Sequence, residues 1–203
     1  MEVHLIAIGG GSGSGKTWLA ERLVKEFGKD AGRLSLDDFY RDLSHLPSEE
    51  RDRTNFDHPN AIDWTLFRRC LEGICTSETA ELPSYDFATH TRRTETKSWP
   101  PRRLVVLDGL WLLRRVELRR LYRLRVVVEC PENIRLERRL ARDQRERGRS
   151  AQSVRAQFAQ HVTPMHNRFV AGQARHADLV VASPTSPARF AELTTRCGQL
   201  LRK

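Results

Sequence analysis

Eight residues near the N-terminus combine the groups that a triphosphate-binding turn requires. They are Gly10, Gly11, Ser12, Gly13, Ser14, Gly15, Lys16 and Thr17, a complete G-x-x-x-x-G-K-[ST] motif. The glycines let successive backbone N–H groups face one anion, and the lysine adds a positive charge for the outer phosphates. The threonine hydroxyl is a suitable ligand for Mg²⁺. A flexible Gly/Ser linker is the alternative, but linkers rarely carry Lys-Thr at this offset after an apolar run. The motif therefore predicts a site for a nucleoside triphosphate, ATP or GTP, with Mg²⁺.

Two carboxylates follow short apolar runs, where a metal–triphosphate site would need them. Asp37 follows residues 34–36, and Asp108 follows residues 104–107. In open α/β sheets, ligands bind beyond the carboxyl ends of the strands, so both side chains are expected near the terminal phosphate. Together with Thr17 they are the candidate Mg²⁺ ligands. Two alternatives stay open, since Asp108 could instead cap a helix and Asp38 could be the functional acid in place of Asp37.

The segments that must position these groups alternate between strand and helix character. This order predicts a parallel sheet with helices on both faces. The expected strands are 3–8, 34–36, 104–107, 124–128 and 178–182, and the expected helices are 18–27, 63–71, 132–149, 150–173 and 187–201. Pro164 must kink or divide the helix that contains it. Residues 41–61 are polar and indicate an irregular loop, and residues 81–99 favour an antiparallel hairpin laid over the site.

Size and composition suit one domain with a real core. The chain has 203 residues, of which 39% are hydrophobic and 30% charged, as is ordinary for a soluble globular protein. No apolar run approaches the roughly 20 residues of a membrane helix, and the N-terminus lacks the pattern of a signal peptide. The four cysteines show no metal-ligand spacing and favour reduced thiols. We therefore expect a cytoplasmic protein without a membrane partner.

The charge balance is strongly basic. The formal net charge is +9, and 30 arginines outnumber 5 lysines. Such a balance can indicate nucleic-acid binding, but aromatic residues are not interleaved with the arginines as a stacking surface for single strands requires. Nucleic acid therefore stays a minor hypothesis. The alternative outside enzymes is a non-catalytic nucleotide-dependent switch or nucleic-acid binder, which salt-dependent oligonucleotide binding would reveal.

Several blocks, in order along the chain, resemble the uridine–cytidine kinase family. They are Asp37–Arg41, Asn55–Pro59 with Asp63, Tyr85–Phe87 with His90 and Arg92, Arg139–Asp143, and Glu146–Arg149. The blocks around Asp57 and His90 are much narrower signals than the phosphate loop alone. The resemblance implies an α/β fold of the P-loop NTPase type, similar to nucleoside monophosphate kinases, with a five-stranded parallel sheet flanked by helices. It also implies one kinase domain over residues 1–203, with a small β-hairpin (81–99) over the nucleoside and an arginine-rich lid region (139–157).

The activity implied by the resemblance is ATP-dependent phosphorylation of the 5′-hydroxyl of uridine or cytidine. By the same resemblance the catalytic residues are Asp37, which accepts or orients the hydroxyl proton, with Lys16, Arg142 and Arg147. The implied substrate-binding residues are Tyr40, Phe56, Asp57, Tyr85, Phe87, His90, Arg139, Arg149 and Gln157. Asp57 would grip the ribose hydroxyls, and Tyr85 with His90 would read the base. Arg135, Arg138 and Arg145 lack family matches and are expected to be solvated helix residues.

Other members of the same superfamily provide the alternative within enzymes. Phosphoribulokinase, pantothenate kinase and nicotinamide riboside kinase phosphorylate other hydroxyls, but Asp57, Tyr85 and His90 address a ribose and a base. The chain departs from the family pattern at Asp108, where Glu is frequent, so its metal contact could run through water. Residues 183–187 bear little likeness to the family's adenine-side segment, which leaves ATP and GTP open. A homo-oligomer, a dimer or tetramer, is expected from the resemblance only.

Overall fold

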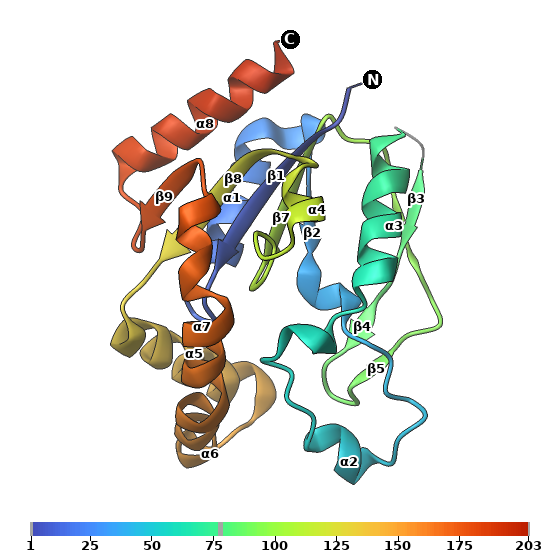
Figure 1. Cartoon of the computed structure of the whole chain (residues 1–203), viewed down its shortest axis with the longest axis vertical. Helices are drawn as coiled ribbons and strands as arrows, with labels where there is room; N and C mark the ends of the chain where they lie inside the picture. The colour runs from blue at the N-terminus through green and yellow to red at the C-terminus, as the bar shows by residue number, and fades with distance from the viewer. Residues whose placement is uncertain (1, 77–78, 203) are drawn as a thin grey trace.

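The computed structural model describes residues 2–76 and 79–202, apart from the side chains of Asp52 and Arg147. A parallel sheet of five strands in the order β2-β7-β1-β8-β9 forms its centre (Figure 1). These strands are β1 (His4–Gly10), β2 (Ala31–Ser35), β7 (Leu104–Gly109), β8 (Tyr122–Glu129) and β9 (Leu179–Ala182). The predicted fold class, a five-stranded parallel sheet flanked by helices, is confirmed.

Helices cover both faces of this sheet. The α-helices of the described residues are α1 (Lys16–Phe27), α2 (Ser48–Asp52), α3 (Trp64–Cys75), α4 (Val116–Arg119), α5 (Glu132–Arg147), α6 (Ala151–Gln157), α7 (Thr163–Phe169) and α8 (Pro187–Leu201). Successive strand side chains point to opposite faces, so Ile6 and Ile8 of β1 pack in a core with α1 and α8. Leu5 and Ala7 pack in a second core with α3. The sheet is therefore buried on both sides, as parallel sheets require.

The segment before β7 forms two short antiparallel ladders beside α3 (Figure 1). Strand β3 (Ala80–Leu82) pairs with β6 (Lys97–Trp99), and β4 (Tyr85–Asp86) pairs with β5 (Thr91–Arg92). This confirms the antiparallel pairing expected for residues 81–99. The two ladders bring Tyr85 and the turn that carries His90 to the same end of the molecule as α2.

Two predicted segments differ from the structure in detail. The helix expected over 150–173 is divided into α6, a π-helical turn (Phe158–Val162), α7 and a 3₁₀ segment (Ala171–His176), with Pro164 in the first turn of α7. The loop expected over 41–61 contains α2 and a 3₁₀ turn (Pro59–Ala61). Short elements of this kind leave no periodicity for a sequence pattern to show.

Local capping explains where two site-bearing elements begin. The Ser35 hydroxyl at the end of β2 accepts a hydrogen bond from the Asp37 N–H and starts a 3₁₀ turn (Leu36–Phe39). The Asp63 carboxylate accepts one from the Leu66 N–H at 3.0 Å, so the predicted N-cap of α3 is confirmed.

Two further observations concern the chain as a whole. Within residues 2–76 and 79–202, no helix combines the length and apolar character that crossing a bilayer would take. All four cysteines, Cys70, Cys75, Cys130 and Cys197, are free thiols, as predicted.

Candidate active site

The phosphate-binding loop joins β1 to α1, as the motif predicted. Gly13 and Gly15 have φ angles of 78° and 92°, which L side chains rarely adopt. A Cβ added at Gly13 would also lie 2.4 Å from the carbonyl oxygen of Arg135, so only glycine fits there. Lys16 is buried at the start of α1, and its Nζ lies 3.5 Å from the carbonyl oxygen of Gly11. The backbone curl, the buried lysine and the N-terminus of α1 together form an anion-binding turn.

Asp37 and Asp108 both lie at the carboxyl edge of the sheet beside this loop. Ser35 of β2 and Ile8 of β1 are the register partners of Asp108 on its two neighbouring strands. Burial lowers the pKa of Lys16, and the charges of Asp37 and Asp108 oppose that effect. Burial likewise raises the pKa of Asp37, and the charge of Lys16 opposes it. Lys16, Asp37 and Asp108 therefore lie close enough for their charges to interact.

The contacts of Asp108 and Asp38 bear on the two alternatives, a helix-capping role for Asp108 and a functional role for Asp38 in place of Asp37. Asp108 caps no helix, because the next helix, α4, begins at Val116 with Arg115 as its N-cap. Asp38 forms an ion pair with Lys97 of β6 at 3.5 Å. Of the two neighbouring acids, Asp37 is thus the one whose charge acts on the phosphate loop most directly.

The oxygen atoms of Thr17, Asp37 and Asp108 are suitable ligands for Mg²⁺ when phosphates are bound beside them. The Thr17 hydroxyl donates to Asp108 Oδ2 at 2.7 Å, which brings two of the three candidate ligands together. Across the described residues, three or more His, Cys, Asp or Glu side chains nowhere gather as a metal-binding group. Mg²⁺ ordinarily takes only one or two carboxylates from a protein and completes its shell with phosphates and water. The hydroxyl and the carboxylates beside the loop match that pattern.

Arg33 is a site residue that sequence reasoning missed. Its Nε donates to Asp108 Oδ1 at 2.8 Å, and its Nη2 lies 3.4 Å from Asp108 Oδ2. Asp108 is therefore held from one side by an arginine of β2 and from the other by Thr17. A single arginine within a short strand forms no local sequence pattern from which its contact with Asp108 could be predicted.

One face of α5 presents four arginines to the phosphate loop, and one of them corrects the sequence analysis. Arg135, expected to be solvated, is 2% exposed, and its Nη1 would lie 3.0 Å from a Cβ added at Gly11. This prediction was wrong because positions i, i+3, i+4 and i+7 share a helix face, and that face packs on the loop. Arg138 is exposed, as expected, although its Nη1 lies 3.4 Å from the carbonyl oxygens of Gly13 and Ser14. Arg145 is exposed, as expected.

The other arginines predicted for the lid form a connected group. Arg139 donates from Nη1 to Ser12 Oγ at 3.0 Å and from Nη2 to Gln157 Oε1 at 2.9 Å. Arg149 donates to the same Gln157 oxygen. Arg142 contacts Asp143, and its charge acts on the pKa values of Lys16 and Asp37. The side chain of Arg147 lies outside the described part of the chain.

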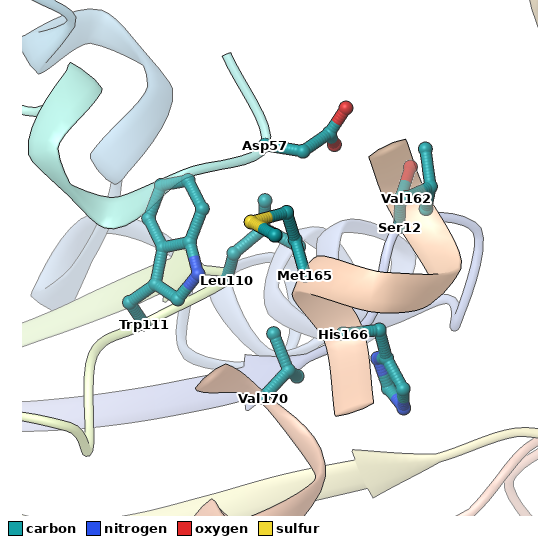
Figure 2. Close-up of a pocket in the computed structure, with 8 residues that line it drawn as sticks. All are labelled: Ser12, Asp57, Leu110, Trp111, Val162, Met165, His166 and Val170. Carbon is teal, nitrogen blue, oxygen red and sulfur yellow. The ribbon is translucent and has the colours of Figure 1, made fainter. Parts of the chain in front are cut away.

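Asp57 lines a small cavity together with Ser12 of the phosphate loop. Figure 2 shows its carboxylate pointing to the side where Ser12 and Val162 lie, with Trp111 on the other side of the cavity and Met165 of α7 between them. Burial raises the pKa of Asp57, and Arg139 Nη1, at 3.8 Å from the carboxylate, opposes that rise. Trp111, Met165 and His166 were not singled out from the sequence, because their role depends on where α7 packs.

The five aromatic and imidazole side chains predicted for the nucleoside site are brought together. The ring of Tyr40 lies 5.5 Å from that of Phe56, 5.4 Å from that of Tyr85 and 6.4 Å from that of Phe87. The imidazole of His90 stacks on Phe56 with centroids 4.2 Å apart and planes at 18°. His90 also has a φ of 55°, which is uncommon for a residue other than glycine and often marks functional turns.

Tyr40 connects the aromatic group to the acids. Its hydroxyl donates to the carbonyl oxygen of Phe56, next to Asp57, at 3.1 Å. Burial raises the pKa of Tyr40, and the charges of Asp37 and Asp57 raise it further. Tyr40 thus lies close enough to Asp37 and Asp57 for both charges to act on it, which connects the aromatic group to the two acids. The chemistry of these groups suits a triphosphate beside the loop and a sugar with a planar ring beside Asp57 and the aromatic group.

Comparison with known proteins agrees with this arrangement. A family model described as "Phosphoribulokinase / Uridine kinase family" matches residues 5–187. A uridine kinase of Chloroflexus aurantiacus is 40% identical over 177 residues, which cover 87% of this chain and 85% of the relative. A uridine kinase of Staphylococcus epidermidis is 38% identical over 204 residues, covering 100% of this chain and 99% of the relative. Among solved structures, phosphoribulokinase from Rhodobacter spheroides shares the fold with a TM-score of 0.65 at 15% identity, covering 89% of this chain and 70% of its own.

Proposed function

The chain belongs to the phosphoribulokinase and uridine kinase family, and on that premise we propose that it is a nucleoside kinase acting on uridine or cytidine. The reaction is transfer of the terminal phosphoryl group of ATP to the nucleoside 5′-hydroxyl. The oxygen–phosphorus bond to ADP breaks, a new bond to the 5′-oxygen forms, and the hydroxyl proton leaves. Such transfers depend mainly on in-line positioning and on neutralising the charge of the phosphates.

One observation carries the proposal. Asp37 Oδ1 is buried, and no other described residue gives it a hydrogen-bond partner. A buried acceptor of this kind is costly unless a ligand satisfies it. A 5′-hydroxyl can donate to Oδ1, which holds the nucleophile beside Lys16 and lets the carboxylate take the proton late in the transfer.

The phosphate side of the site is assigned to the loop and its neighbours. The backbone N–H groups of residues 10–17 cradle the phosphates, and Lys16 and Arg142 compensate charge on the group being transferred. Thr17, Asp37 and Asp108 are the proposed holders of Mg²⁺, which when bound neutralises phosphate oxygens. Thr17 and Asp108 are already joined at 2.7 Å, so they can act together without rearrangement.

The nucleoside side is assigned to Asp57 and the aromatic group. Asp57 can accept hydrogen bonds from the two vicinal ribose hydroxyls, and deoxyribose would leave one of those acceptors without a donor. Phe56, Phe87 and Tyr40 supply apolar walls for a pyrimidine. His90 and Tyr85 supply the polar edge, and a neutral imidazole can both donate and accept, which suits uracil and cytosine alike. Residues 81–99 would cover this end, and residues 139–157 would close as the lid.

A phosphorylation screen tests the proposal. Purified protein with Mg²⁺ and ATP is offered uridine, cytidine, nicotinamide riboside, pantothenate and ribulose 5-phosphate, and the products are separated by chromatography. We expect turnover of uridine or cytidine and of none of the other acceptors. Turnover of another acceptor, without either pyrimidine nucleoside, would reject the proposal. Lys16→Ala serves as the control for a contaminating kinase.

The same assay resolves the finer parts. Replacing uridine by 2′-deoxyuridine should lower kcat/KM by at least about tenfold, the scale expected when a buried acceptor loses its donor. Replacing ATP by GTP identifies the donor. Equal use of uridine and 2′-deoxyuridine would remove Asp57 from the ribose-binding role.

A further inference from the structure

Asp143 is a fully buried carboxylate in the lid region to which the proposed reaction gives no task. It lies near the end of α5, its exposed fraction is 0%, and among the described side chains three guanidinium groups lie within 4 Å of it. These belong to Arg139, Arg142 and Arg149. A buried carboxylate needs such compensation, because removing a charge from water costs several kcal/mol.

The two oxygens of Asp143 face different arginines. Oδ1 accepts from Nε of Arg142 at 2.8 Å and lies 2.7 Å from its Nη2. Oδ2 lies 3.4 Å from Nε of Arg139 and 3.8 Å from Nη1 of Arg149. The backbone N–H of Arg149 also donates to the Asp143 carbonyl oxygen at 3.2 Å, which ties the turn after α5 to the same residue.

These arginines connect Asp143 to both parts of the site. The charge of Arg142 acts on Lys16 and Asp37 of the phosphate side and also on Asp57. Arg139 is on the sugar side, with Nη1 at 3.8 Å from Asp57, and it reaches the loop through Ser12. Arg149 is linked to Arg139, because both donate hydrogen bonds to the same side-chain oxygen of Gln157. One carboxylate is thus common to the groups that would contact the phosphates and those beside the ribose.

We propose that Asp143 is a positioning residue that couples nucleoside binding to nucleotide binding. Phosphates near Lys16 attract the Arg142 guanidinium and weaken its contact with Oδ1. Among the described side chains, Arg139 and Arg149 then compensate the negative charge of Asp143, which draws the sugar-side group inward. Linkage requires the reverse effect to be of equal size, so a bound nucleoside strengthens nucleotide binding. This inference rests on the proposed function, because it takes uridine and ATP as the two ligands.

Calorimetric titration measures the coupling directly. The affinity for uridine is determined with and without saturating Mg²⁺ and a non-hydrolysable ATP analogue, and the ratio of the two affinities is the coupling factor. In the wild-type protein we expect a factor of at least about five, within the usual range for coupled sites. In Asp143→Asn the factor should fall below about two. Asp143→Glu, which keeps the charge, should recover part of it.

A control separates coupling from the loss of an ion pair. Asp178, just before β9, also forms a two-point ion pair with an arginine, Arg125 of β8, and the two side chains are 31% and 34% exposed. Asp178→Asn should therefore lower stability and leave the coupling factor unchanged. If Asp143 served only to stabilise α5, Asp143→Asn would behave like this control, and that result would overturn the inference.

A second variant keeps the test decisive if Asp143→Asn does not fold. Arg149 is partly exposed, and Arg149→Lys keeps its charge, but one ammonium group cannot contact Asp143, Gln157 and Ser153 together. We expect the coupling factor to fall below about two, as in Asp143→Asn. An unchanged factor would overturn the inference. Absence of uridine binding to the wild-type protein would overturn the proposed function, whereas binding without coupling would overturn only the role of Asp143.

Discussion

The chemistry of Asp37 depends on the charges packed around it. Burial raises the pKa of its carboxyl group, and Asp108 and Asp38 act in the same direction. Lys16 and Arg142 act against this rise and favour the ionised form. The balance is a carboxylate that is more basic than one in water and yet held beside positive charge. That combination suits a group that must accept a proton while a phosphoryl group moves away from ADP.

Asp37→Asn is expected to separate binding from chemistry. The amide keeps the size of the side chain but cannot accept the hydroxyl proton, so kcat should fall by at least about a hundredfold, the scale of a positioned proton acceptor. Nucleotide affinity, measured by calorimetry, should change by less than about threefold. The matched control is Asp38→Asn, whose parent side chain pairs with Lys97 and should matter little. If Asp38→Asn were the slow variant, the proton acceptor would be Asp38.

His166 gives a second prediction at this scale, for stability against pH. Burial, with a smaller effect of Arg135, lowers the pKa of His166 from 6.5 to about 4. The folded protein therefore resists protonation of this imidazole, and the unfolded chain does not. Its contribution to stability is complete above pH 6.5 and is lost as the pH falls towards 4. His166→Gln should remove about 1 to 2 kcal/mol of the difference in unfolding free energy between pH 7.5 and pH 5.

Urea unfolding at the two pH values measures this difference. The control is His45→Gln, because His45 is an exposed residue in the polar segment before α2. An equal pH dependence in wild-type protein and His166→Gln would show that His166 does not titrate as its burial implies.

At the scale of helices and strands, the sequence predicted those features that depend on a local residue pattern. The strands before Gly10 and before Asp108 are apolar runs of ordinary length, and the cap at Asp63 has its side chain at the expected place. The same holds for the loop itself, whose glycine backbone and whose Lys16 and Thr17 side chains all lie within eight consecutive residues. Each of these features rests on interactions within a few residues, which a pattern can capture.

Features set by long-range packing could not be predicted in this way. Arg135 has the pattern of a surface residue on a charged helix and becomes buried only because α5 packs against the loop. Arg138 stays exposed, but its contact with the loop also depends on this packing. Arg33 contacts Asp108 only because β2 and β7 are neighbours in the sheet. The site residues predicted from the family blocks lie together in the structure, yet the cavity wall formed by Trp111 and His166 had no pattern of its own. Its position follows from where α7 turns after the π-helical segment.

Gly13→Ala tests how tightly α5 and the loop are fitted together. The added methyl group would meet the Arg135 carbonyl oxygen at 2.4 Å, and the φ of 78° disfavours any L side chain. We expect at least about a tenfold loss of nucleotide affinity, because the strain of roughly 1–3 kcal/mol must be relieved by moving the loop. Calorimetry with the ATP analogue measures it. Gly73→Ala, inside α3 with open space around it, should instead raise stability by about 0.5–1 kcal/mol.

Over the whole molecule, part of the arginine surplus forms ion pairs with acidic residues of the protein itself. Several arginines are paired with acids that they orient, as in the contacts of Arg33 with Asp108, Arg125 with Asp178 and Arg142 with Asp143. Others crowd the phosphate loop from α5. The net charge of +9 is therefore concentrated in part where a polyanionic substrate would enter. A field of this kind favours encounter with a charged ligand and has little effect on a neutral one.

The two substrates of the proposed reaction differ in charge, and this difference makes the field measurable. The Mg²⁺ complex of ATP is an anion and uridine is neutral. Raising the salt concentration from 0.05 M to 0.5 M shortens the screening length, so kcat/KM for ATP should fall by about threefold to tenfold while that for uridine changes by less than about twofold. Replacing Arg138 by Gln, beside the loop, should reduce the slope for ATP more than replacing the exposed Arg145 by Gln. If kcat/KM depended on salt equally for both substrates, the positive charge would not favour the binding of ATP at the site specifically.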